Sequence, residues 1–212
     1  MSINLSYAIT VCDEHEELKN LLSQLITYID IEDEIVIQID QSNHTELVLQ
    51  TIRDIIAAFP ANQINLLMFP LNKDFATYKN NLKNNCTKDF IFFIDADELL
   101  SEDLLLNFKQ VLEMNPTIDC YNFPRVNTVS GLTQDHIIKW GWRVNEKGWI
   151  NFPDKQKRVC RNTQTIQWQN KVHETLVGWT NIADLPDDEI WAIIHNKTIE
   201  KQEKQNALYQ TI

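Results

Sequence analysis

Residues 90–100 read FIFFIDADELL, in which five apolar residues run directly into three carboxylates, Asp95, Asp97 and Glu98. A short apolar run bounded by turn-forming residues predicts a buried strand, here one that ends at Asp95. Carboxylates this close repel each other, and a carboxylate beside an apolar strand loses hydration. Because buried charge needs a partner, and a bound cation is the usual one, the stretch predicts a cation site at the end of a buried strand.

Three strand–helix units precede this stretch, and one helix follows it. Apolar runs predict strands at 5–11, 34–40, 64–70 and 89–95. Helical periodicity predicts helices at 14–29, 46–59, 74–85 and 101–114. Strands that alternate with helices predict an α/β fold whose mostly parallel central sheet is covered on both faces.

Beyond residue 115 the regular alternation of strand and helix patterns ends. Residues 120–126 predict another strand, and residues 197–210 predict a C-terminal helix. Between them, residues 139–152 (KWGWRVNEKGWINF) show no helical period and predict strands, a hairpin or an exposed loop. Neither a repeat nor a linker is visible, so we expect one domain over 1–212 with an irregular, β-rich second half.

The net charge of −11 argues against general nucleic-acid binding. The charge is uneven, because residues 1–120 carry 20 acidic and 7 basic residues whereas residues 121–212 carry 10 and 12. The basic residues within 139–171 are consistent with solvated strand faces or with a surface for an anionic substrate or lipid headgroup.

The cysteines and the N-terminal residues indicate in which cellular compartment the protein is expected. The four cysteines are widely spread and form no CxxC pair, which predicts reduced thiols and no zinc site. Residues 1–17 lack the basic and apolar segments of a secretion signal, and no apolar run approaches membrane-spanning length. We therefore expect a cytoplasmic protein and leave peripheral contact with the inner face of a membrane open.

Two predicted strands end in carboxylates at the same place, Asp40 and Asp95. One such residue alone is more often a helix cap or a turn residue. Ligands of open α/β sheets, however, bind at the carboxyl ends of the strands. The two residues together therefore predict a site in one crevice.

Several segments resemble the family 2 glycosyltransferases, which have the nucleotide-sugar-binding fold called GT-A. The resemblance runs through ITVCDEHEELKNLL, EIVIQIDQSN and FATYKNNLKNNCTKDFIFFIDADE, and it places Asp95-Ala96-Asp97 on the family's DxD motif. GWINFPDKQKRVCRN and NKVHETLVG resemble a subgroup that acts in bacterial cell-surface glycan synthesis. The chain departs from the family at Gln41-Ser42-Asn43, where Gly-Ser-x-Asp is frequent, and at Asp13-Glu14, where Asn-Glu is usual.

The resemblance implies an inverting glycosyltransferase of the hexosyltransferase type. Residues 1–115 would bind a nucleoside-diphosphate sugar, and residues 116–212 would face a glycan or lipid-linked acceptor. The implied donor-binding residues are Thr10, Cys12, Glu14, Asp40, Lys79, Asn80, Asp95, Ala96 and Asp97.

The resemblance also implies a divalent cation, Mg²⁺ or Mn²⁺, that neutralises the diphosphate leaving group. Asp97 is the first candidate ligand, Asp95 would contact the ribose or metal-bound water, and His195 would complete the metal shell. A histidine after an apolar strand is equally consistent with a buried, hydrogen-bonded residue.

An inverting enzyme needs a base that takes the proton of the acceptor hydroxyl. The resemblance assigns this role to Glu174 in KVHETLVG, with His173 as the second candidate and Asp154 as a further one. Trp140, Trp142 and Trp149 either stack on sugar or cover the sheet edge and fill the core.

Two alternatives remain. FIFFIDADELL also fits a haloacid-dehalogenase-type phosphatase, with Asp95 as nucleophile and Asp97 as acid, although those enzymes usually have Thr or Val at the place of Leu99. A domain that binds nucleotide or glycan without turnover is the other. The sequence leaves the sugar, the nucleotide, the acceptor and the oligomeric state open.

Overall fold

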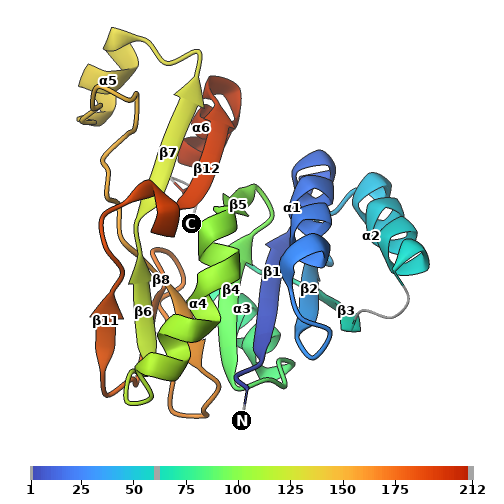
Figure 1. Cartoon of the computed structure of the whole chain (residues 1–212). Helices are drawn as coiled ribbons and strands as arrows, with labels where there is room; N and C mark the ends of the chain where they lie inside the picture. The colour runs from blue at the N-terminus through green and yellow to red at the C-terminus, as the bar shows by residue number, and fades with distance from the viewer. Residues whose placement is uncertain (1, 60–62, 210–212) are drawn as a thin grey trace.

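A computed structural model describes residues 2–59 and 63–209. Its largest sheet has seven strands in the order β11-β6-β8-β4-β1-β2-β3 (Figure 1). The four strands from the first half are mutually parallel. They are β1 (Leu5–Val11), β2 (Glu34–Asp40), β3 (Gln63–Phe69) and β4 (Phe90–Asp95). The predicted α/β fold with a mostly parallel central sheet is confirmed.

Four helices cover the two faces of this sheet. They are α1 (His15–Tyr28), α2 (Glu46–Ala58), α3 (Phe75–Asn84) and α4 (Glu102–Met114). Side chains of α1, α2 and α4 pack with alternate strand residues in one core cluster, whereas α3 packs in a second cluster on the other face (Figure 1). Coverage on both faces explains why β1, β2 and β4 are near-continuous apolar runs.

The second half extends the sheet and builds two smaller ones. β8 (Gln156–Arg161) pairs antiparallel with both β4 and β6 (Cys120–Phe123), and β11 (Ile182–Asp184) pairs parallel with β6. A three-stranded sheet has the order β5-β12-β7, and a hairpin joins β9 to β10. These strands are β5 (Glu98–Leu100), β7 (Arg125–Ser130), β9 (Gln167–Gln169), β10 (Thr175–Val177) and β12 (Ile193–Thr198).

The structure differs from the sequence prediction at three places in this half. The helix expected at 197–210 begins at Ile199, because Lys197 and Thr198 end β12, and residue 210 lies outside the described residues. The strand expected at 120–126 is split at Pro124, where the chain leaves the central sheet for the three-stranded one. Residues 139 and 140 end a helix, α5 (Gln134–Trp140), which Gly141 closes with a φ of 65°. The rest of that stretch is irregular, apart from a bridge between Val144 and Ile150.

The tryptophans of this stretch are half-buried and form two small aromatic clusters outside the two main cores. Trp140 stacks on His136 at a centroid distance of 5.1 Å and contacts Trp142 at 4.6 Å. Trp149 packs on Phe152 at 4.9 Å. In Figure 1, α5 stands at the far end of β7, away from the central sheet.

The C-terminal helix α6 (Ile199–Tyr209) contacts the loop after β1 and the start of α1 through charged side chains. Lys204 pairs with Asp13 at 3.1 Å, and Lys201 pairs with Glu17. A 3-10 turn, η1 (Glu189–Trp191), precedes β12. None of the helices within residues 2–59 and 63–209 is both long and apolar enough to cross a membrane.

Candidate active site at the carboxyl ends of the central strands

The turn between β4 and β5 carries the DxD residues, and β1 holds it in place. Thr10 lies opposite Asp95 in the β1–β4 register, and its Oγ1 donates a hydrogen bond to Asp95 Oδ1 at 3.0 Å. The Ala96 amide donates to the Thr10 carbonyl at 3.1 Å. The tight connection to β5 then sends Asp97 away from the strand axis of β4, so the two aspartates enter different surroundings.

Asp95 belongs to a group that we call the inner cluster: Lys79, Asp95, Glu98, Arg158 and Glu174. Arg158 Nη2, from β8, lies 3.1 Å from Asp95 Oδ2 and 2.5 Å from Glu98 Oε1. Lys79 Nζ, from α3, lies 2.7 Å from Glu174 Oε1 and 3.7 Å from Asp95 Oδ1. In this cluster the chain therefore supplies its own close cationic partners to Asp95 and Glu98.

Glu98 anchors the inner cluster. Its side chain is fully buried, and its Oε2 accepts a hydrogen bond from the Asp95 amide at 3.0 Å, which closes the turn. Its Oε1 accepts from Arg158 and, at 3.3 Å, from Arg125 of β7. Burial by itself would raise the pKa of the Asp95 carboxyl, but Lys79 and Arg158 hold this pKa well below its usual value.

Asp97 belongs to a second group, the outer cluster: Asp97, Asn127, His195 and Lys197. His195 Nε2 lies 3.3 Å and Lys197 Nζ 3.8 Å from Asp97 Oδ2. Burial favours a raised pKa for Asp97, but His195 in its protonated form and Lys197 lower it below the ordinary value. His195 is the third residue of β12, and its Nδ1 lies 2.8 Å from Asn127 Oδ1 of β7.

The outer cluster supplies only part of the ligand shell that a divalent cation needs. Within the described parts of the chain, no three His, Cys, Asp or Glu side chains are placed to hold a metal together. Asp97 and His195 present one carboxylate and one imidazole, a donor pair that Mn²⁺ accepts. Mg²⁺ and similar ions in nucleotide sites commonly use one or two carboxylates and take other ligands from substrate phosphates and water. The residues present are compatible with such a site.

The loop after β1 places Cys12 and Glu14 on the same edge. Glu14 Oε2 accepts hydrogen bonds from the Cys12 amide at 2.8 Å and the Asp13 amide at 3.1 Å. Burial raises the pKa of Glu14, and the nearby negative charge of Asp97 adds to the shift. Glu14 thus lies near the outer cluster, although its hydrogen bonds serve the local backbone.

Asp40 and Asn80 make contacts that also explain them as structural residues. Asp40 Oδ1 accepts hydrogen bonds from the amides of Ser42 and Leu71, at 3.0 and 3.1 Å, and so shapes the turn after β2. Asn80 exchanges two hydrogen bonds of 2.9 Å with the backbone of Trp168 and fastens α3 to β9. Nucleotide contacts of these two residues stay predictions.

The two candidate bases differ in their surroundings. Glu174 precedes β10, has a side chain that is 17% exposed, and reaches Asp95 through Lys79. His173 is exposed and has a φ of 53°, in the left-handed region. The fold thus joins Glu174, through Lys79, to the strand that carries the DxD motif.

Sequence reasoning did not find Arg125, Asn127 and Lys197. It placed Arg158 among the basic residues of 139–171, which predicted solvated strand faces or a surface for an anionic substrate or lipid headgroup. Arg158 is instead 3% exposed and serves the inner cluster. Asn127 meets His195 only because β7 and β12 pair in register. No local pattern carries that information, since the two residues are 68 positions apart.

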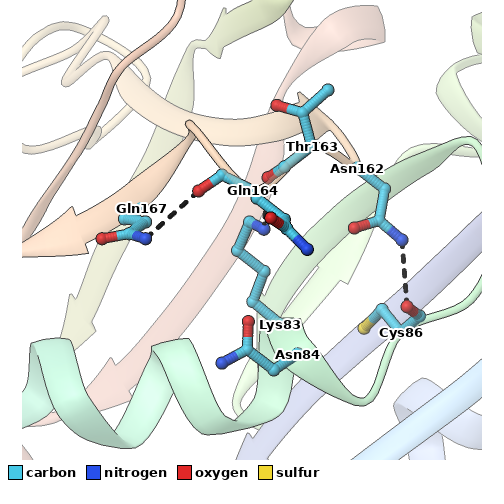
Figure 2. A pocket seen from close by; sticks show the side chains of 7 residues that line it. All are labelled: Lys83, Asn84, Cys86, Asn162, Thr163, Gln164 and Gln167. Carbon is cyan, nitrogen blue, oxygen red and sulfur yellow. Dashed lines mark hydrogen bonds between the residues drawn. The ribbon is translucent and has the colours of Figure 1, made fainter.

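Two cavities lie away from these clusters. The one in Figure 2, of about 540 Å³, is lined by the C-terminal end of α3 and by the segment after β8. Its lining residues are Lys83, Asn84, Cys86, Asn162, Thr163, Gln164 and Gln167. The other, of about 520 Å³, lies near Ser2, Phe90 and Arg161. No residue of either cluster lines them.

A parallel α/β sheet with an acidic turn and cationic side chains at its carboxyl edge has its polar groups where open α/β folds bind their ligands. The family model described as "Glycosyl transferase family 2" matches residues 6–174, so the chain belongs to that family. A comparison with curated protein sequences finds no match.

Solved structures show a similar fold. The S. aureus TarS fragment 1–349 in complex with UDP-GlcNAc is 13% identical, with a TM-score of 0.63, and the match covers 93% of this chain and 59% of that one. The same fragment with UDP is 12% identical, with a TM-score of 0.64, and the match covers 92% and 60%. The chain thus spans about 60% of the length of that fragment.

A third similar structure is the mannosyltransferase PcManGT from Pyrobaculum calidifontis in complex with GDP-Man and Mn²⁺. It is 16% identical, with a TM-score of 0.49, and the match covers 58% of this chain and 35% of that one.

Proposed function

We propose that the protein is a glycosyltransferase that moves a sugar from a nucleoside-diphosphate sugar to a glycan or lipid-linked acceptor. The observation that carries this proposal is the family match over residues 6–174 together with the link from Glu174 through Lys79 to Asp95. The resemblance to enzymes of bacterial cell-surface glycan synthesis supports such an acceptor. The proposed place of action is the cytoplasm, at the inner face of the membrane when the acceptor is lipid-linked.

In this proposal the outer cluster holds the diphosphate end of the donor. Asp97 and His195 would bind Mg²⁺ or Mn²⁺, and the ion would neutralise charge on the leaving diphosphate. Lys197, 3.8 Å from Asp97, adds a fixed positive charge on the same side. Thr10, Cys12, Glu14, Asp40 and Ala96 line the strand ends where the nucleoside would lie.

The inner cluster sets the position of the base. Lys79 contacts Glu174 through Oε1 at 2.7 Å, so we assign the second oxygen, Oε2, to proton transfer. A carboxylate there would take the proton of the acceptor hydroxyl as that oxygen attacks the sugar. Attack from the side opposite the diphosphate would invert the configuration at the transferred carbon.

The phosphatase alternative is weakened by the contacts of Asp95. Its Oδ1 accepts from Thr10 and lies near Lys79, and its Oδ2 accepts from Arg158. Those contacts stabilise the charge but hold both oxygens against the protein, which is unfavourable for a nucleophile. Absence of p-nitrophenyl phosphate hydrolysis in the presence of Mg²⁺ is the expected result.

The experiment that tests the proposal is a thermal-shift screen with nucleoside diphosphates and nucleotide sugars, with and without Mn²⁺, followed by a donor-hydrolysis assay. Ligand binding to the native state raises the melting temperature by mass action. We expect at least one nucleotide sugar to stabilise the protein and to be slowly hydrolysed without acceptor. Stabilisation without hydrolysis or transfer would indicate a binding domain, and no stabilisation by any donor would refute the proposal.

A further inference from the structure

His195 Nδ1 contacts Asn127, which in turn contacts Asp154, and the proposed function gives neither residue a role of its own. In the parallel pairing of β7 and β12, Asn127 is the register partner of His195. Asn127 Oδ1 lies 2.8 Å from His195 Nδ1, and Asn127 Nδ2 donates to Asp154 Oδ2 at 2.6 Å. Asp154 Oδ2 also accepts from Arg125 Nε at 2.9 Å and Nη2 at 2.8 Å.

The chemistry of these groups determines which atom donates and which accepts in each hydrogen bond between Asp154, Asn127 and His195. An ionised carboxylate only accepts hydrogen bonds, so Asp154 requires the amide nitrogen of Asn127 to face it. Burial would raise the pKa of Asp154, but Arg125 and Asn127 lower it, which keeps the group ionised. The amide oxygen of Asn127 then faces His195 and requires a proton on Nδ1.

This arrangement has a consequence at the opposite nitrogen. If Nδ1 carries the proton of a neutral imidazole, Nε2 presents a lone pair, and it does so 3.3 Å from Asp97 Oδ2. Two acceptors at that distance repel unless a positive centre lies between them. A proton or a divalent cation removes the repulsion, and a divalent cation held there would also bind a diphosphate.

We propose that Asp154 and Asn127 are positioning residues that lock His195 in the Nδ1–H tautomer and so present Nε2, with Asp97, to a divalent cation. Arg125 links this set of hydrogen bonds to the inner cluster, because it contacts both Asp154, at 2.8 Å, and Glu98, at 3.3 Å. The inference rests on the proposed function for the cation, whereas the tautomer follows from the hydrogen bonds alone. The same contacts remove Asp154 from the candidates for the base.

The tautomer can be measured without any ligand. In protein labelled with ¹⁵N-histidine, at a pH of about 8, well above the ordinary histidine pKa of about 6.5, ring nitrogen shifts distinguish the tautomers. The His195 signals are assigned by their loss in His195→Gln. We expect the wild type to show Nδ1–H and Asn127→Ala, which keeps the Arg125–Asp154 pair, to show a mixture. A wild type with Nε2–H, or an unchanged tautomer in Asn127→Ala, would overturn the proposal.

The second readout is Mn²⁺ binding, followed by calorimetry with UDP and with GDP. Loss of a residue that orients a metal-binding histidine typically costs roughly 10–100-fold in metal affinity. We expect this loss in Asp154→Asn and Asn127→Ala. The matched control is Asp184→Asn, since Asp184 also accepts from an asparagine amide, Asn122 Nδ2 at 2.7 Å, outside both clusters.

The outcomes separate the two proposals. Affinities of both variants within the range of the Asp184→Asn control would overturn the positioning role. A wild type that has the Nδ1–H tautomer but binds no Mn²⁺ with either nucleotide would overturn the cation role of Nε2 and the metal-dependent part of the proposed function, while sugar transfer itself could still be detected without metal.

Discussion

The inner and outer clusters begin two residues apart on one turn, yet their charges are balanced in different ways. The inner cluster draws Arg158 and Lys79 from the central sheet and α3, with contacts as short as 2.5 and 2.7 Å. The outer cluster draws His195 and Lys197 from the three-stranded sheet, at 3.3 and 3.8 Å from Asp97. The acidic stretch that looks like one motif in the sequence therefore has two roles in the fold. Asp95 and Glu98 brace the fold through close ion pairs with Arg158, whereas Asp97 has only longer contacts with positive groups.

The largest expected effect concerns the one member of the inner cluster that we assign to chemistry. Glu174→Gln keeps size and the contact with Lys79 but removes the base, so transfer should fall by roughly 10²–10⁴-fold. Donor affinity, measured by calorimetry, should stay nearly the same. His173→Gln is the matched control and should retain most activity. If Glu174→Gln transfers sugar normally, the base lies elsewhere; if it loses donor binding, Glu174 belongs to the donor site.

Arg158→Met tests whether the inner cluster is a brace. The change leaves Glu98 with only its longer contact to Arg125 and Asp95 with only its longer contact to Lys79. Breaking a buried pair in this way costs about 3–5 kcal/mol in the free energy of unfolding. Arg53→Met is the control, because Arg53 pairs with Glu46 on the surface and its loss should cost less than about 1 kcal/mol. Urea denaturation gives both values, and equal losses would remove the distinction between brace and surface pair.

Asp97→Asn tests the outer cluster. In the wild type, Mn²⁺ with nucleoside diphosphate at 100 times Kd should stabilise the fold by about 2.7 kcal/mol. In the variant this gain should vanish, while the ligand-free melting temperature changes little because the contacts of Asp97 are long. Asp95→Asn should behave differently and lower the ligand-free melting temperature, since it loses Arg158 and Lys79 as ion partners. Unchanged ligand stabilisation in Asp97→Asn would exclude the metal role.

The smallest effect is the acid dependence of stability. Burial would raise the pKa of Asp95 in the folded protein, but Lys79 and Arg158 lower this pKa well below its usual value. Its ion pairs therefore contribute stability fully above the unfolded pKa of about 3.9 and lose it as pH falls through the lower folded pKa. Unfolding free energies measured between pH 6 and pH 2 should fall less steeply in Arg158→Met than in the wild type, and identical slopes would contradict this.

The sequence predicted the first half of the fold because its signals are local. The strands expected at 5–11 and 34–40 match β1 and β2 at both ends, and the helix expected at 101–114 is α4, which begins one residue later, at Glu102. Each needed only a continuous apolar run or a helical period. The position of Asp95 at the end of β4 followed in the same way.

The second half and the surroundings of the carboxylates could not be predicted on that basis. The strands β5, β9, β10 and β11 have three residues each, too few for a period. Arg158 and Glu98 are 60 positions apart, and their contact depends on the pairing of β8 with β4. The sequence predicted a bound cation at the acidic turn, and that call stays a prediction; the positive groups that the structure places there are side chains of the chain itself, Lys79 and Arg158.

The attachment of α6 has a consequence for how the protein responds to its solution. Lys204 and Lys201 join this helix to Asp13 and Glu17, on either side of Glu14, through pairs that are largely open to water. Dissolved ions screen such pairs, with a screening length of about 8 Å at physiological ionic strength and about 3 Å at 1 M. Added salt therefore weakens the contact between α6 and the loop after β1, while the buried ion pairs of Arg158 stay intact.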